Sequence, residues 1–183
     1  MIRTLLWLLA GVVLGGIIHI AVILSLPALS ATSAWDHVAA AGGTGPGPTV
    51  LAATTSAQPN PLRLDPELAY AVCRIDLRTG PASVTGTLPQ AFWSVAVYNR
   101  AGTVVYSTTN RDGIGTALDL GIFNPGQTRL LAEQKLDIAE GLLIVEAKED
   151  DLFVVVRLAP PHPEMRARYE KALAGLKCGT IAT

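Results

Sequence analysis

The stretch that decides the fold is Ala69-Tyr70-Ala71-Val72-Cys73-Arg74-Ile75-Asp76-Leu77, in which two sets of side chains alternate with a period of two. Successive side chains of a β-strand point to opposite faces of its sheet, so this period predicts a strand with one buried face. The set predicted on the buried face is Ala71, Cys73, Ile75 and Leu77. Gly80-Pro81 then break the pattern and predict a turn.

Further strand patterns follow along the chain. The clearest is a hairpin, because residues 92–98 and 103–108 are rich in β-branched and aromatic residues and flank a turn at 99–102. Two near-continuous apolar runs, 142–147 and 152–158, are joined by an acidic turn and predict central strands. The remaining strand candidates are 83–87, 116–122 and 128–133.

An amphipathic helix is predicted over residues 164–177, with Pro163 suited to the first helical position. Its apolar residues recur at helical spacing: Met165, Tyr169, Ala172, Leu173 and Leu176. Short strands followed by one helix predict a mainly β fold with one C-terminal α-helix. We expect an antiparallel β-sandwich or rolled sheet with the helix laid on or against it.

The amino end predicts a single N-terminal transmembrane helix. Residues 5–26 carry no charge, and this length spans a hydrocarbon core of ~30 Å. Arg3 precedes the run and the next basic residue is Arg63, so the amino end should stay in the cytoplasm. We expect a single-pass protein of the inner (plasma) membrane, in contact with the lipid bilayer, with a periplasmic C-terminal domain. A cleaved signal peptide is the alternative, although its apolar core would be unusually long.

One face of this helix carries Gly11, Gly15 and His19 at a spacing of four residues. Small residues let a second helix approach closely, and an imidazole in hydrocarbon needs a polar partner. The spacing predicts a helix-pairing face, and hence a homo-oligomer or a heterologous partner. The alternative is that the glycines occur by chance and His19 reaches interfacial water.

Composition divides the rest of the chain into a tether and a folded domain. Glycine and proline crowd residues 28–62 without an apolar period, which predicts a tether, and the domain is expected over 63–183 after an anchor at 1–27. Within the tether, residues 34–41 could form an interfacial helix with Trp35 at the headgroup level, or remain irregular.

Length and charge exclude several classes of protein. A chain of 183 residues allows one ordinary domain with an appendage. It is 50% hydrophobic and only 16% charged, which predicts membrane contact. Fourteen basic residues against fifteen acidic ones leave no basic footprint, so no nucleic-acid partner is expected.

Two stretches of the chain, 65–77 and 92–100, resemble the short, membrane-anchored bacterial proteins of domain-of-unknown-function family 1254. The likeness covers residues 1–178 and includes an Ala-Tyr-x-Val-Cys-Arg strand, a Phe-Trp-Ser hairpin and a carboxy-terminal helix ending in Cys. The resemblance implies a β-rich domain on the outer face of the inner membrane, and a partner of the sister family 1214. It implies no activity and therefore no catalytic residue.

The two cysteines, Cys73 and Cys178, are expected to form a disulfide, because an exported domain lies where thiols are oxidised. The alternative is two buried free thiols, since a bond requires the two Cα atoms to come within ~7 Å.

The sequence contains no catalytic or metal-binding signature, so we expect no cofactor, no metal and, on balance, no enzyme. Asp76, Asp112, Asp119 and residues 149–151 could supply an acid and a base, but charged turns are usually solvated surface. Thr108, Asn110, Asp112, Gly113 and Asp119 imitate the spacing of an EF-hand loop, but the first position lacks a carboxylate and the last lacks the bidentate Glu, so a plain turn explains them equally well.

Two functions remain open. The first is an uncharacterised inner-membrane protein whose periplasmic β-rich domain is an interaction or scaffold module. The second is a membrane-held domain that binds or hydrolyses a small molecule, with a pocket between sheet and helix. A filled core favours the first and a concave pocket lined by polar groups favours the second.

Overall fold

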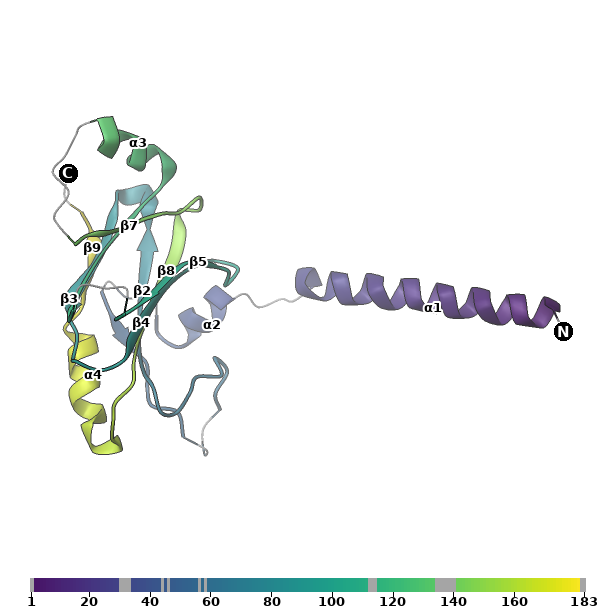
Figure 1. The fold of residues 1–183 in the computed structure, drawn as a ribbon, viewed down its shortest axis with the longest axis horizontal. Helices are drawn as coiled ribbons and strands as arrows, with labels where there is room; N and C mark the ends of the chain where they lie inside the picture. Colours follow the sequence, from purple (N-terminus) through teal and green to yellow (C-terminus); the bar gives the residue numbers. More distant parts are fainter. Residues whose placement is uncertain are drawn as a thin grey trace. The chain divides into compact units, whose positions relative to one another are not determined.

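The structure is a computed structural model that describes residues 2–29, 34–43, 45, 47–55, 57, 59–111, 115–133 and 141–181. For residues 27–29 it describes the backbone alone. The chain divides into two compact units, Met1–Ser33 and Ala34–Thr183. Figure 1 follows the elements of both units along the sequence.

The first unit is the helix α1 (Ile2–Leu29). Its stretch Ile2–Leu26 is long and apolar enough to cross a membrane. A cleaved signal sequence at the amino end has the same length and composition. These two properties therefore establish an apolar helix that is either retained in the membrane or removed.

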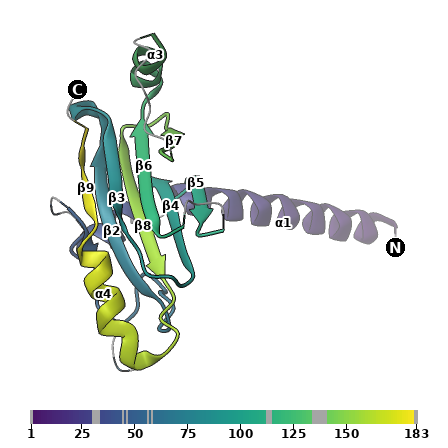
Figure 2. The same ribbon diagram turned by 60° about the vertical axis from the view of Figure 1, so that its left-hand side comes forward.

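The second unit contains two β-sheets. The five-stranded sheet has the order β1 (Thr49–Val50), β2 (Ala69–Asp76), β8 (Asp151–Leu158), β4 (Trp93–Asn99) and β5 (Val104–Thr109). The four-stranded sheet has the order β7 (Leu143–Glu146), β6 (Ala117–Phe123), β3 (Ala82–Thr87) and β9 (Lys177–Thr180). Neighbouring strands run antiparallel except β6 and β7, which are parallel. Figure 2 shows the two layers and the C-terminal helix α4, which confirms the expected mainly β fold.

The core lies between the two sheets. Ala71, Cys73 and Ile75 of β2 are buried on the inner face as the period of two predicts. They belong to the same core cluster as inner residues of the four-stranded sheet, such as Val84 of β3 and Leu120 of β6. This space is filled by side chains, so the layers are joined by apolar burial.

The strand β8 is central, because it pairs with β2 on one side and with β4 on the other. The prediction that residues 142–147 also form a central strand is wrong, since β7 lies at an edge of the other sheet. The acidic turn therefore connects the two sheets and does not close a hairpin. A local apolar run specifies burial but not the sheet to which a strand belongs.

The segment predicted as a strand at 128–133 is instead part of the helix α3 (Pro125–Glu133). Asn124 and Gln127 cap its first turn reciprocally: the Asn124 backbone N–H donates to Gln127 Oε1, and the Gln127 backbone N–H donates to Asn124 Oδ1, each at 2.9 Å. This capping box, with proline at the first helical position, favours a helix over a strand.

The C-terminal helix is shorter than predicted. A 3-10 turn at Pro163–Met165 leads into α4 (Arg166–Ala174), and Gly175 ends it. The helix buries Tyr169 and Leu173 and packs against β1 and β2. Residues 177 and 178, predicted at the end of the helix, belong to the additional strand β9, which pairs with β3.

The compact unit begins at Ala34 and not at residue 63, because much of the predicted tether packs on the domain. The helix α2 (Ala34–Ala40) forms where an interfacial helix or an irregular linker was expected, and Trp35 packs edge-on against Phe153 with ring centroids 6.2 Å apart. Val38 of α2 and Leu51, next to β1, are buried in a second apolar cluster. The large apolar side chains of this segment follow no period along the sequence, but Trp35 and Leu62 also pack against this cluster.

Candidate functional site

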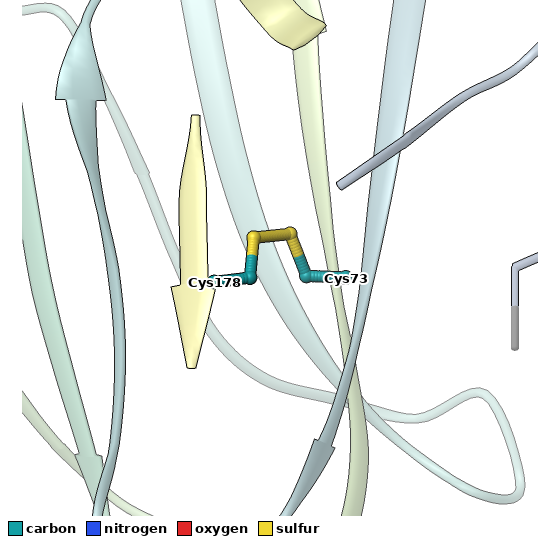
Figure 3. The surroundings of a disulfide bond; sticks show 2 residues. All are labelled: Cys73 and Cys178. Carbon is teal, nitrogen blue, oxygen red and sulfur yellow. A yellow bond between two sulfur atoms is a disulfide. The ribbon is translucent and has the colours of Figure 1, made fainter. Parts of the chain in front are cut away.

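Cys73 and Cys178 form a disulfide, as predicted from the sequence. Cys73 lies on β2 and Cys178 on β9, and their Cα atoms are 6.1 Å apart (Figure 3). The bond therefore links the five-stranded sheet to the four-stranded sheet across a sequence separation of 105 residues. A disulfide of this kind stabilises the fold, chiefly by restricting the unfolded chain.

The carboxylates considered as acid and base make structural contacts. Asp76 accepts two hydrogen bonds from the Arg78 guanidinium, at 2.9 and 3.1 Å, and Asp151 accepts a third at 2.7 Å. The side-chain hydrogen bond from Arg78 lowers the pKa of Asp76 below its ordinary value of 3.8. The contribution of Asp76 to stability is thus present above that value and lost as the pH falls through the lowered pKa.

The remaining acidic candidates are dispersed. Asp150 accepts from Asn124 at 3.1 Å, Glu149 accepts from Asn99 at 2.9 Å, and Asp119 lies on β6. Asp112 and Gly113 of the EF-hand-like spacing lie outside the described residues. Within the residues that were described, no three His, Cys, Asp or Glu side chains form a group that could hold a metal ion.

The predicted helix-pairing residues Gly11, Gly15 and His19 all lie on α1. A Cβ atom added at either glycine would meet no other atom within 4 Å, so both positions present an open backbone surface. His19 is exposed. The pairing itself stays a prediction.

A pocket of about 410 Å³ lies on the outer face of the five-stranded sheet, opposite the filled core. Its walls come from α2, from residues 61–64, and from the outward-facing side chains of β2, β4 and β8. This place differs from the expected pocket between sheet and C-terminal helix, because α2 and not α4 covers this face.

Aromatic rings build one side of this outer-face pocket. The Tyr98 ring stacks on the Phe153 ring with centroids 5.1 Å apart and an interplanar angle of 9°. Trp35 packs edge-on against Phe153 without lining the pocket, and the Arg74 guanidinium lies 4.7 Å from the Trp35 ring centroid. Tyr70 adds a third lining ring, and its hydroxyl accepts from the Asp65 backbone N–H at 3.0 Å.

The polar side chains in this pocket are predominantly basic. Arg63, Arg157 and His37 line it, and none of the described lining residues is Asp or Glu. Arg157 is half-buried on β8, and its Nη2 donates to the Tyr98 hydroxyl at 2.8 Å. The site can therefore offer guanidinium donors beside an apolar and aromatic wall.

Arg63 sits in an unusual backbone conformation. Its φ of 49° is the only positive value at a non-glycine residue in the described part of the chain. Asn60 holds this turn: its Nδ2 donates to the Leu64 carbonyl at 2.7 Å, and its Oδ1 accepts from the Leu64 backbone N–H at 2.8 Å. A strained residue kept in place by its neighbours is common at binding sites.

Sequence reasoning missed this pocket, although one signal was present. The outward set of β8 includes Phe153 and Val155, and that of β2 includes Tyr70 and Val72, so both faces of the central strands are apolar. A strand that is apolar on both faces needs a cover on each. The cover here comes from residues 34–64, whose composition predicted a tether.

A second surface is the free edge of the five-stranded sheet at β5. The described part of the chain pairs β5 with β4 alone. Val104 and Val105 on this strand are 50% and 39% exposed. Residues 103–109 include no charged residue and no proline.

Comparison with known proteins establishes a fold likeness only. No family model matches the chain, and no curated protein matches it. The crystal structure of the VPA0106 protein from Vibrio parahaemolyticus is similar, with a TM-score of 0.55 and 11% sequence identity over 79% of this chain and 33% of that one. An uncharacterized protein from Burkholderia cenocepacia gives a TM-score of 0.39 and 16% identity over 75% of this chain and 42% of that one. This chain spans about a third of the length of VPA0106, and the likeness concerns the fold alone.

Proposed function

We propose that this protein is a single-pass inner-membrane protein whose β-rich domain lies in the periplasm and acts as an interaction module that assembles with a second copy. The apolar helix α1 supports the anchor, and the basic residue before it supports the orientation. The disulfide supports a periplasmic domain, because such bonds persist in oxidising compartments.

The observation that carries the assembly is the unprotected edge at β5. Soluble proteins guard sheet edges with charges, prolines, very short strands or covering elements. The other described edges follow this rule: β1 has two residues, β7 ends in Glu146, and β9 begins with Lys177. The uncharged edge of β5 is therefore the one on which another strand can add.

The backbone pattern of β5 leaves hydrogen-bonding groups on this edge. In an antiparallel ladder, residue pairs that exchange backbone hydrogen bonds alternate with pairs that do not. Asn110 and Trp93 form a bonded pair, because the Asn110 backbone N–H donates to the Trp93 carbonyl at 3.1 Å. Ser107 lies opposite Ala96, three positions along the ladder, so this pair is not bonded. Its backbone N–H and carbonyl therefore point away from β4, toward the free side.

Symmetry favours a second copy as the added strand. Antiparallel pairing of two β5 strands places a two-fold axis perpendicular to the joined sheet. The helix α2 packs on the outer face of this sheet, so both copies present α2 on the same side. In each copy the chain enters the domain through α2, which follows the anchor in sequence.

Co-purification of two differently tagged copies from native membranes in mild detergent tests the assembly. Ser107→Lys should reduce recovery of the second copy about tenfold, because it places a charge on the edge and like charges near the axis. Thr87→Lys puts the same charge on the exposed end of β3, away from this edge, and should leave recovery unchanged.

A second pair of variants tests whether the anchor helix α1 also contributes to the assembly. Gly11→Ile and Gly15→Ile should weaken recovery if the α1 face also pairs, since the added branches keep two helices apart. Full recovery with Ser107→Lys contradicts assembly through β5. Mass spectrometry of the purified material identifies any family 1214 partner, and a heterologous protein recovered in place of the second copy also contradicts the proposal.

A second function, small-molecule binding, is favoured by one specific observation: the basic and aromatic pocket on the outer face of the five-stranded sheet. The two functions are independent, because the pocket and the β5 edge use different residues.

A further inference from the structure

We infer that the outer-face pocket binds an amphiphilic anion, that is, a carboxylate or phosphate group attached to an apolar body. This inference does not depend on assembly through β5. It rests on the charge of the lining, the shape of the apolar wall and the rigidity of the turn that closes the pocket.

The charge of the lining selects an anion. Arg157, Arg63 and His37 converge on the pocket from β8, from the turn after Asn60 and from α2. The ion pairs of the described residues involve Arg78 and Arg166, and Arg157 takes part in none of them. Arginine has five N–H donors in a planar fork that matches carboxylate or phosphate oxygens, and Arg157 commits only Nη2 to Tyr98.

The apolar wall selects the body of the ligand. Val38, Leu51, Leu62 and Val72 line the pocket together with the rings of Tyr98 and Phe153. A volume of about 410 Å³ lies within the range of small-molecule sites. It fits an acyl chain or an aromatic acid of modest size. A free inorganic anion would contact only the basic side chains of this lining, and an uncharged hydrocarbon would contact only its apolar and aromatic side chains.

The turn at residues 60–64 gives the pocket a fixed edge. Both hydrogen bonds between Asn60 and Leu64 hold the backbone around Arg63, and the Arg63 backbone N–H donates to the Asn60 carbonyl at 3.1 Å. A site whose donors are already placed loses less conformational entropy when it binds. Arg63, with its φ of 49°, belongs to this turn and lines the pocket.

Two sources could supply this chemistry: a free organic acid or phosphate of the surrounding compartment, and an anionic lipid or fatty acid of the bilayer. Four residues, 30–33, separate the end of α1 from the start of α2. Since α2 contributes to the pocket lining and follows α1 so closely in sequence, an anionic lipid is tested as a ligand beside the free acid. The experiment therefore has separate arms for the two sources.

Titration of the full chain in nanodiscs of zwitterionic phosphatidylcholine tests the inference, with empty discs as the reference for partition into lipid. The probes share an eight-carbon chain and differ in the head group: octanoate, octyl phosphate and octanol. Acetate and inorganic phosphate supply the head group alone. Calorimetry reports binding, and the tryptophan fluorescence, to which Trp35 beside Phe153 contributes together with Trp7 and Trp93, is a second readout.

Octanoate or octyl phosphate should bind at least about tenfold more tightly than octanol and than either head group alone, because hydrogen bonds to charged groups and burial of the chain both contribute. Repeating the titration in discs that contain phosphatidylglycerol distinguishes the sources. Loss of octanoate binding there identifies the bilayer lipid as the occupant, and unchanged binding identifies a free acid.

Arg157→Gln should weaken binding of the anionic probe about tenfold or more. Arg74→Gln is the matched control, because Arg74 lies on the same face, stacks on Trp35 and does not line the pocket. Arg157 is half-buried on a central strand, so the exposed Arg63→Gln provides a second variant whose folding is not at risk. Equal binding of octanol and octanoate, no binding above empty discs, or equal losses in Arg157→Gln and Arg74→Gln would each overturn the inference.

Discussion

At the scale of single residues, the disulfide between Cys73 and Cys178 joins two sheets that otherwise meet through apolar contacts. Cys73 is fully buried on β2, and Cys178 is half-buried on the edge strand β9. The bond therefore fixes an edge strand to the interior of the opposite layer.

Removal of either cysteine should lower the free energy of unfolding by about 2–4 kcal/mol. We expect similar losses for Cys73→Ala and Cys178→Ala, and no larger loss for the double variant, since all three remove one bond. Denaturant unfolding of the full chain in detergent measures the change. Maleimide labelling of the denatured wild type without reductant should find no free thiol, and two labelled thiols would contradict the bond.

At the scale of elements, α3 shows how a local signal can be overlooked. Its capping residues also reach the rest of the domain: Gln127 Nε2 donates to the Leu77 carbonyl at 2.8 Å, and Asn124 Nδ2 donates to Asp150. The first turn of α3, which follows β6 of the four-stranded sheet, is thus hydrogen-bonded to residues that flank β2 and β8 of the five-stranded sheet, although none of the α3 residues is buried.

Gln127→Ala should lower the free energy of unfolding by about 1–2 kcal/mol, because it removes the cap on the Asn124 N–H and the bond to Leu77. Arg129→Ala, on an exposed position of the same helix, should change it by less than about 0.5 kcal/mol. Thermal and urea unfolding measure both. Equal effects of the two variants would show that the capping contacts contribute nothing.

The elements that the sequence predicted well are those with a local period. Alternation in β2 and the β4–β5 hairpin required no knowledge of partners. The strand β9 and the edge position of β7 could not be found in this way, because each depends on a strand distant in sequence. The pocket was missed for the same reason, since its walls combine residues 34–38 and 61–64 with three strands.

At the scale of the whole molecule, the two compact units have different surroundings under the proposed topology. The helix α1 exposes its apolar side chains along its length, whereas the β-rich unit buries its own between two sheets. An apolar helix without a protein partner is stable in a bilayer.

Alkaline phosphatase fused after residue 183 should be active in bacterial cells, and a cytoplasmic reporter at the same point should be inactive. Replacing Arg3 by Glu and adding two lysines after residue 29 should reduce the phosphatase signal, because the basic residues then favour the opposite orientation. Fractionation distinguishes an anchor from a cleaved signal, since only the anchored protein stays with the membrane. An active cytoplasmic reporter would contradict the periplasmic domain.

The central place of β8 has a consequence for how the chain matures. Under the proposed topology, the chain is threaded outward from its amino end and delivers β2 and β4 long before β8, the strand that lies between them. The β4–β5 hairpin can close at once, but β2 must wait with apolar side chains on both faces. Such late pairing slows folding and leaves a partly folded state with exposed apolar side chains, which is prone to aggregation. Newly exported molecules should therefore depend on holding chaperones until β8 emerges, after which the two halves of the sheet join.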